Sequence, residues 1–168
     1  MKTDVIYKKI LVPIDFSDAS RKAFYVALKF ARLFDAETTA LHVFEPMDTF
    51  DSSGRVEAQG KEMARLEDGV KRRVNELFAK GGLTEVDRRK VFVDIRGGKA
   101  WREILTAVVE KDIDLVVMGN TGTSGLKELL LGSTTERVVR RAPCHVLCVK
   151  TDDYEYDPIP VPTKFKEV

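Results

Sequence analysis

Three glycines and one serine have the types and spacing in this chain that point most directly to chemistry. Gly119 and Gly122 follow a continuous apolar run, 115–118, and Gly132 and Ser133 come after nine further residues. Glycine lets backbone N–H groups approach an anion closely, and the first turn of a helix offers N–H donors without intrahelical partners. The spacing therefore predicts a cradle for phosphate groups between a buried strand and the start of a helix.

The chain around these glycines alternates between short apolar stretches and longer stretches with helical periodicity. Helical segments of ten or more residues between strands imply right-handed βαβ units and a parallel sheet covered on both faces. The chain is therefore predicted to be an α/β protein with one doubly wound sheet. Strands are expected at residues 8–15, 37–44, 91–96, 115–118 and 145–150, and helices at 17–34, 54–80, 100–111 and 132–143.

The glycine pattern with its flanks resembles the ATP-binding branch of the universal stress protein family. The pattern is Gly119-x-x-Gly122, then nine residues, then Gly132-Ser133. The flank VVMG leads into it and ends at Gly119, and ERVVRRAPCHVLCV follows it. The N-terminal KKILVPIDFSDAS is similar to that family's first strand and turn. The resemblance covers residues 8–150. It implies five parallel strands in the order 3-2-1-4-5, an adenine nucleotide alpha hydrolase-like fold.

The resemblance also implies where a nucleotide would bind. Ligands of doubly wound sheets bind beyond the carboxyl ends of the strands where the winding reverses, here between the first and fourth strands. Asp15 would hydrogen-bond the adenosine part, Pro13 and Val43 would line the adenine slot, and Met118 would pack nearby. Ribose and phosphates would lie against Gly119, Asn120, Thr121, Gly122, Thr123, Ser124, Gly132, Ser133 and Thr134. The implied ligand is ATP or AMP, with Mg²⁺ held mainly by the phosphates.

One position departs from the family pattern. Thr123 stands just after the second glycine, where many relatives carry Arg or Lys. Loss of that cation would weaken phosphate binding or change the preferred nucleotide.

These residues have structural interpretations as well. Asp15 is also suited to capping the first helix or bracing its turn. Ser133 and Glu136 have the spacing of a capping box, in which each side chain accepts from a backbone N–H group without any ligand. Gly122 is alternatively needed only for turn dihedral angles. His42 and Trp101 are expected to be packed core residues rather than ligands.

Other catalytic and nucleotide-binding motifs are absent from the sequence. Gly98-Lys99 is followed by Ala100, so the hydroxyl of a P-loop is missing, and no G-x-G-x-x-G follows a strand. Neither His42 nor His145 belongs to a Ser–His–acid pattern. Asp15 is the one acidic candidate near the site, at its adenosine end, so ATP hydrolysis is expected to be slow at most.

Composition excludes several partners. The 168 residues suit one domain, and a net charge of +1 gives no broad electrostatic attraction for nucleic acid or an anionic membrane. The basic run 71–73 is expected to be a solvated helix face. No apolar run approaches the roughly 20 residues that span a bilayer, and cytoplasm is the expected location. Cys144 and Cys148 are expected to be reduced and mostly buried.

The end of the chain suggests an assembly. Residues 1–150 are expected to form the domain, and 151–168 a proline-rich tail, either extended over a partner through Tyr154, Tyr156 and Phe165 or disordered. The strand 145–150 is nearly all apolar, yet the implied order places it at an edge, so a homodimer through this strand is expected.

The first functional interpretation is therefore an ATP-binding regulatory or stress-response protein that acts as a homodimer. A nucleotide-free dimeric interaction module and a slow ATP hydrolase or phosphotransferase are the alternatives. Such a protein would signal through its dimer to a further protein partner.

Overall fold

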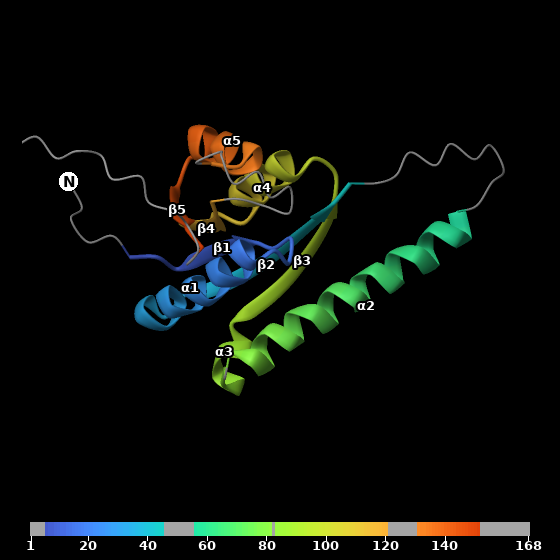
Figure 1. Cartoon of the computed structure of the whole chain (residues 1–168), viewed down its shortest axis with the longest axis horizontal. Helices are drawn as coiled ribbons and strands as arrows, with labels where there is room; N and C mark the ends of the chain where they lie inside the picture. The colour runs from blue at the N-terminus through green and yellow to red at the C-terminus, as the bar shows by residue number, and fades with distance from the viewer. Residues whose placement is uncertain (1–5, 46–55, 82, 121–130, 152–168) are drawn as a thin grey trace, which may run out of the picture.

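The fold is a five-stranded parallel sheet with helices on both faces (Figure 1). The computed structural model describes residues 6–45, 56–81, 83–120 and 131–151, with the backbone alone for 56–63. The strand order is β3-β2-β1-β4-β5, which confirms both the predicted α/β class and the order implied by the family resemblance. The strands are β1 (Lys9–Pro13), β2 (Glu37–Phe44), β3 (Val91–Gly97), β4 (Leu115–Gly119) and β5 (His145–Val149).

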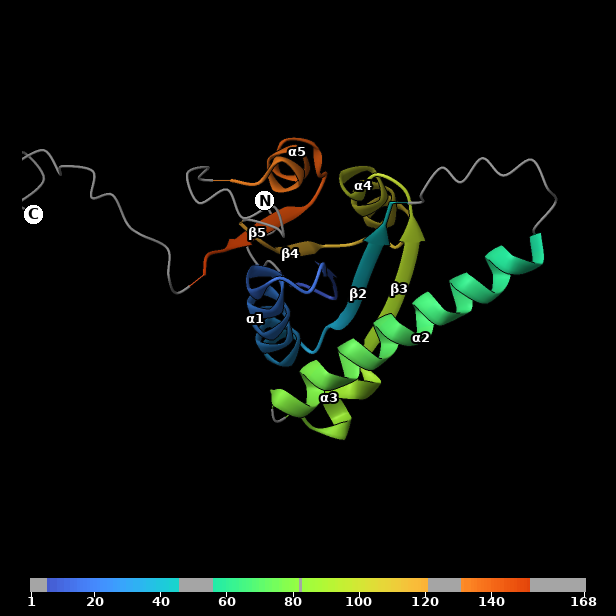
Figure 2. The same cartoon turned by 45° about the vertical axis from the view of Figure 1, so that its right-hand side comes forward.

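Helices α1 and α2 cover one face of the sheet, and α4 and α5 cover the other (Figure 2). A short helix, α3, which the sequence did not predict, follows α2 and begins at a capping box formed by Thr84 and Asp87. The helices are α1 (Asp18–Phe34), α2 (Val56–Lys80), α3 (Glu85–Arg89), α4 (Ala100–Glu110) and α5 (Ser133–Arg141).

The two faces of the sheet have separate cores because successive strand side chains point to opposite faces. In β1, Ile10 and Val12 lie in the cluster beneath α1 and α2, whereas Leu11 lies in the cluster beneath α4 and α5. In β4, Val117 joins the first cluster, and Val116 joins the second. All five side chains are fully buried, so these central strands read as continuous apolar runs.

The edge strands are less buried. Every residue of β3 is half-buried or exposed, as expected for an edge, and in β5 only Val149 is buried. Cys148 lies in β5, whereas Cys144 precedes it, and both thiols are free. Burial raises the pKa of both thiols. Among the helices of the described ranges, none is long and apolar enough to span a bilayer.

The basic run 71–73 lies on the exposed face of α2, as expected. Lys71 pairs with Glu67 one turn earlier, at 3.6 Å. Arg73 differs from a purely solvated residue, because its guanidinium carbon lies 4.0 Å from the centre of the Phe16 ring.

The tail 152–168 and the expected contacts of Tyr154, Tyr156 and Phe165 lie outside the described residues.

Candidate functional site

The sheet pairing stops early at the point where the winding direction reverses. Strand β1 pairs with β2 along its whole length, from Lys9↔Glu37 to Pro13↔Leu41. Its pairing with β4 involves only Ile10↔Leu115 and Leu11↔Val116. Beyond Leu11, β1 is therefore bonded to β2 alone, at the carboxyl edge where doubly wound proteins bind their ligands.

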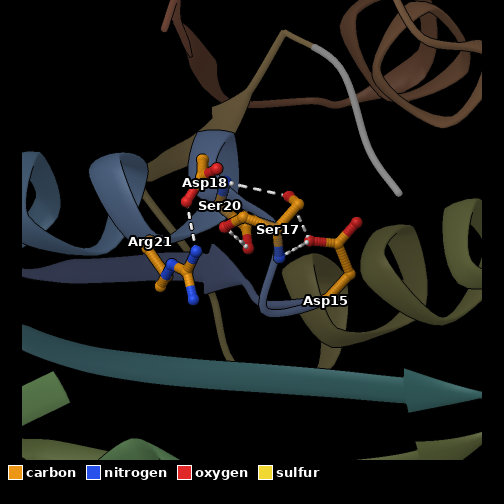
Figure 3. Close-up of polar contacts among 5 residues, drawn as sticks. All are labelled: Asp15, Ser17, Asp18, Ser20 and Arg21. Carbon is orange, nitrogen blue, oxygen red and sulfur yellow. Dashed lines mark hydrogen bonds and ion pairs between the residues drawn. The ribbon is translucent and has the colours of Figure 1, made fainter. Parts of the chain in front are cut away.

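The turn after β1 places Asp15 at this edge. Asp15 is exposed, and its Oδ1 accepts hydrogen bonds from the backbone N–H of Ser17 at 3.0 Å and from the Ser17 hydroxyl at 2.6 Å (Figure 3). The Ser17 Oγ also accepts from Ser20 N at 3.3 Å and so caps α1. Asp15 thus braces the turn through the capping residue and does not itself cap the helix. This bracing role is compatible with an additional ligand contact.

A left-handed residue sets the direction of the same turn. Phe16 has φ of 65°, which is unusual for a residue with a side chain, and the residue is buried at 7% exposure. Its ring contacts both the His42 ring, 5.3 Å away, and the guanidinium of Arg73. His42 is 2.7 Å from the Ile14 carbonyl through its Nδ1, which fits the expected packed role. Packing of Phe16 inward leaves the neighbouring Asp15 carboxylate on the outside.

Gly119, at the end of β4, is in close contact with α1. A Cβ atom at this position would lie 2.7 Å from the Cβ of Ala19 and 2.9 Å from its carbonyl carbon. The Gly119 carbonyl accepts a hydrogen bond of 2.9 Å from the buried hydroxyl of Thr135 in α5. Close helix packing therefore requires this glycine even without a ligand.

Asn120 connects β4 to the start of α5. Its N–H donates to the Val149 carbonyl at 2.9 Å, and its carbonyl accepts from Gly132 N–H at 2.7 Å. Asn120 is 2% exposed, and within the described part of the chain its Oδ1 has no hydrogen-bond donor. These bonds hold the first turn of α5 at the carboxyl end of β4 (Figure 2).

The first turn of α5 begins one residue earlier than the capping-box interpretation assumed. Gly132 is the N-cap residue, with no side-chain cap, and Ser133 is the first helical residue. The Glu136 carboxylate pairs with Arg140 at 3.2 Å instead of returning to Ser133. The predicted Ser133–Glu136 capping box is therefore wrong, because a glycine occupies the cap.

This start leaves backbone donors available. The first N–H to bond back within the helix is that of Glu136, which donates to the Gly132 carbonyl at 2.9 Å. The N–H groups of Ser133, Thr134 and Thr135 precede it and have no intrahelical acceptors by helix geometry. Together with the helix dipole, they form a favourable environment for an anion.

The adenine-slot residues divide between core and edge. Met118 is 4% exposed and belongs to the core beneath α4 and α5, against which the half-buried Val43 packs. Pro13 is half-buried at the end of β1. The loop residues Thr121, Gly122, Thr123 and Ser124 lie outside the described residues. In the described ranges, His, Cys, Asp and Glu side chains form no group of three that could hold a metal ion.

Two residues at this edge of the sheet have structural roles that the sequence did not predict. Thr135 was not singled out, although it stands three residues before the buried Val138, a spacing that predicts the same buried helix face. Asn120 was expected only as a ligand contact. Its backbone hydrogen bonds to Val149 in β5 and to Gly132 before α5 form only when the folded chain brings these segments together.

A family comparison agrees with this architecture. The model of the universal stress protein family matches residues 6–150. The chain belongs to the universal stress protein family. Universal stress protein MJ0531 of Methanocaldococcus jannaschii is 34% identical to it over 147 residues, covering 86% of this chain and 83% of that relative. MJ0577 of the same organism is 32% identical over 157 residues, covering 87% of this chain and 96% of that relative.

Solved structures place this universal stress protein in the same fold group. The structure of MJ0577 aligns with a TM-score of 0.70 at 30% identity, covering 89% of this chain and 99% of that one. A universal stress protein in complex with cAMP aligns with a TM-score of 0.60 at 24% identity, covering 86% and 97%. At that identity the second likeness concerns the fold alone.

Proposed function

We propose that this universal stress protein binds ATP or AMP at the carboxyl edge of its sheet, between the β1–α1 turn and the first turn of α5. The observation that carries the proposal is the start of α5, where Gly132 caps the helix without a side chain and first-turn N–H groups lack intrahelical acceptors. Phosphate groups would accept from these donors and from the Ser133 hydroxyl. Mg²⁺ would be held mainly by the phosphates.

The adenosine part would occupy the other side of the same edge. Asp15 is exposed there on a turn braced by Ser17 and by the packed Phe16, so its carboxylate is placed to accept from ribose hydroxyls. Pro13 and Val43 offer half-buried apolar surface for the base. A protein of the same fold has been solved in complex with cAMP, an analogy that supports the class of ligand.

The proposed role is regulatory binding by a homodimer in the cytoplasm, with hydrolysis slow at most. The edge strand β5 leaves the apolar residues Val146, Leu147 and Cys148 only half-buried, and pairing with a second copy would cover them. The main alternative is a dimeric scaffold without a nucleotide. The contact between Gly119 and Ala19 favours that alternative at one position, because it explains this glycine without a ligand.

Titration calorimetry with ATP and Mg²⁺, comparing the natural protein with Gly132→Val, tests the proposal. Gly132 has φ −65° and ψ 149°, an extended conformation that valine adopts readily, so the variant is expected to fold. Its side chain would occupy the phosphate position. The natural protein should bind with a Kd near micromolar, about −8 kcal/mol.

The variant should show no binding heat and an unchanged light-scattering mass. Normal ATP binding by Gly132→Val would show that the first turn of α5 does not form part of the nucleotide site. Absence of binding by the natural protein at millimolar ATP would leave the scaffold alternative.

A further inference from the structure

Three arginines converge on Trp101, the only tryptophan of the chain. Their guanidinium carbons lie 5.1 Å (Arg102), 5.5 Å (Arg137) and 5.4 Å (Arg141) from the centre of the indole ring. Arg102 neighbours the tryptophan in α4, whereas Arg137 and Arg141 are one turn apart in α5. We call these four residues the Trp101 cluster; it lies where α4 and α5 pack together (Figure 1).

The Trp101 cluster lacks negative charge. All three arginines are exposed, and within the described ranges none of them forms an ion pair. The carboxylates of these two helices are engaged elsewhere. Glu136 pairs with Arg140 at 3.2 Å, and Glu110, at the far end of α4, pairs with Arg96 at 2.9 Å. The Glu103 carboxylate lies beside Gly98. Like charges gathered on one ring repel one another, so this surface is suited to an anionic partner.

We propose that the acidic beginning of the C-terminal tail, residues 152–157, docks on the Trp101 cluster of its own chain. This segment reads DDYEYD and contains four carboxylates and no basic residue. Arginine pairs bidentately with carboxylates and stacks on aromatic rings. Tyr154 and Tyr156 therefore add a second kind of contact for the same three side chains.

The segment starts close enough to reach the cluster. Val149, the last residue of β5, is hydrogen-bonded to Asn120, which in turn is bonded to Gly132 at the start of α5. Arg137 and Arg141 lie about 8 and 14 Å farther along that helix. Six extended residues span about 20 Å, so the segment covers this distance after the chain leaves β5.

The fluorescence of Trp101 provides the measurement. In nucleotide-free, full-length protein at low salt, the quenching constant of acrylamide, which is neutral, reports how well the ring is covered. The test variant is Asp152→Asn/Asp153→Asn/Glu155→Gln/Asp157→Asn, which keeps size and removes charge. Each exposed ion pair shifts the equilibrium between the free and the docked tail about twofold toward docking, so three pairs shift it about eightfold.

The quenching constant should rise about twofold in this variant, and equally in the natural protein at 1 M salt, where charges are screened beyond about 3 Å. In an Arg137→Gln/Arg141→Gln background only Arg102 remains to pair with the tail, so neutralising the tail should change the quenching constant much less. The matched control is Arg140→Gln on the same helix, already paired with Glu136, in which the effect of the tail should persist.

An unchanged quenching constant on neutralising the tail would overturn the proposal. So would an effect of equal size in the Arg137→Gln/Arg141→Gln background. An effect that disappears on dilution would assign the docking to a second copy and overturn docking within one chain. None of these outcomes depends on nucleotide binding, so this proposal and the proposed function fail separately.

Discussion

Gly119→Ala should destabilise the protein even when no ligand is present. The added Cβ would lie 2.7 Å from the Ala19 Cβ and 2.9 Å from its carbonyl carbon, whereas carbon atoms pack at about 3.5–4.0 Å. The second contact involves backbone, so rotation of a side chain cannot relieve it. The first turn of α1 must then move away from β4, and with it the Ser17 cap that is hydrogen-bonded to Asp15.

The magnitude follows from two opposing terms. Overpacking a well-packed site costs about 1–3 kcal/mol, and replacing glycine in a conformation open to other residues returns about 0.4–1 kcal/mol through the unfolded chain. The midpoints of these two ranges leave a net loss of about 1.3 kcal/mol. At about 2–4 °C per kcal/mol for a chain of this size, that corresponds to a fall in Tm of about 3–5 °C.

Urea denaturation of nucleotide-free protein measures this loss, and Gly69→Ala is the matched control. Gly69 lies within α2, and a Cβ there would meet no atom within 4 Å, so the same substitution should stabilise by about 0.5–1 kcal/mol. If Gly119→Ala were as stable as the natural protein while Gly69→Ala behaved as expected, the close approach of α1 to β4 would be refuted.

Three further substitutions or measurements test the surrounding structure. Thr135→Val keeps the shape but leaves the Gly119 carbonyl without its donor, and should cost about 1–3 kcal/mol in urea denaturation; an unchanged midpoint would contradict the bond. The Arg32 hydrogen bonds hold the pKa of Asp87 well below its usual range, so Asp87→Asn should lower Tm at pH 7 by about 2–4 °C. That difference should shrink as the pH falls below about 4, because the stabilisation from a depressed carboxylate pKa is complete only above the unfolded pKa and is lost as the pH falls toward the folded pKa; a difference in Tm that stayed constant would contradict the Arg32 hydrogen bonds. Cys144 and Cys148, whose pKa values burial raises, should react with iodoacetamide more slowly at pH 7 than free cysteine; equal rates would contradict their burial.

The strands and long helices were predictable because each carries a local signal. Runs such as Ile10-Leu11-Val12 and the helical spacing of Ala23, Ala27 and Ala31 identify buried faces directly. Helix α3 was missed because Glu85–Arg89 is too short for periodicity. Its Thr84-x-x-Asp87 cap was the available signal. The strand order came from the family resemblance, since hydrophobic pattern does not determine which strands are neighbours.

The site was predicted less completely, for reasons that lie in tertiary structure. Ser133 and Glu136 satisfy a capping-box pattern, but Gly132 takes the N-cap position, and the pattern alone does not determine the register of a cap. Gly119 was attributed to phosphate binding, yet the contact with Ala19, a hundred residues earlier in sequence, also requires it. Only the folded chain brings these two residues together.

Mass spectrometry of the nucleotide released from freshly purified protein tests the central claim most directly, followed by equilibrium dialysis of the stripped protein against radiolabelled ATP. We expect ATP or AMP in the extract and one nucleotide per chain on rebinding, with a Kd near micromolar. An extract without adenine nucleotide, together with no retention at millimolar ATP, would contradict nucleotide binding at the start of α5.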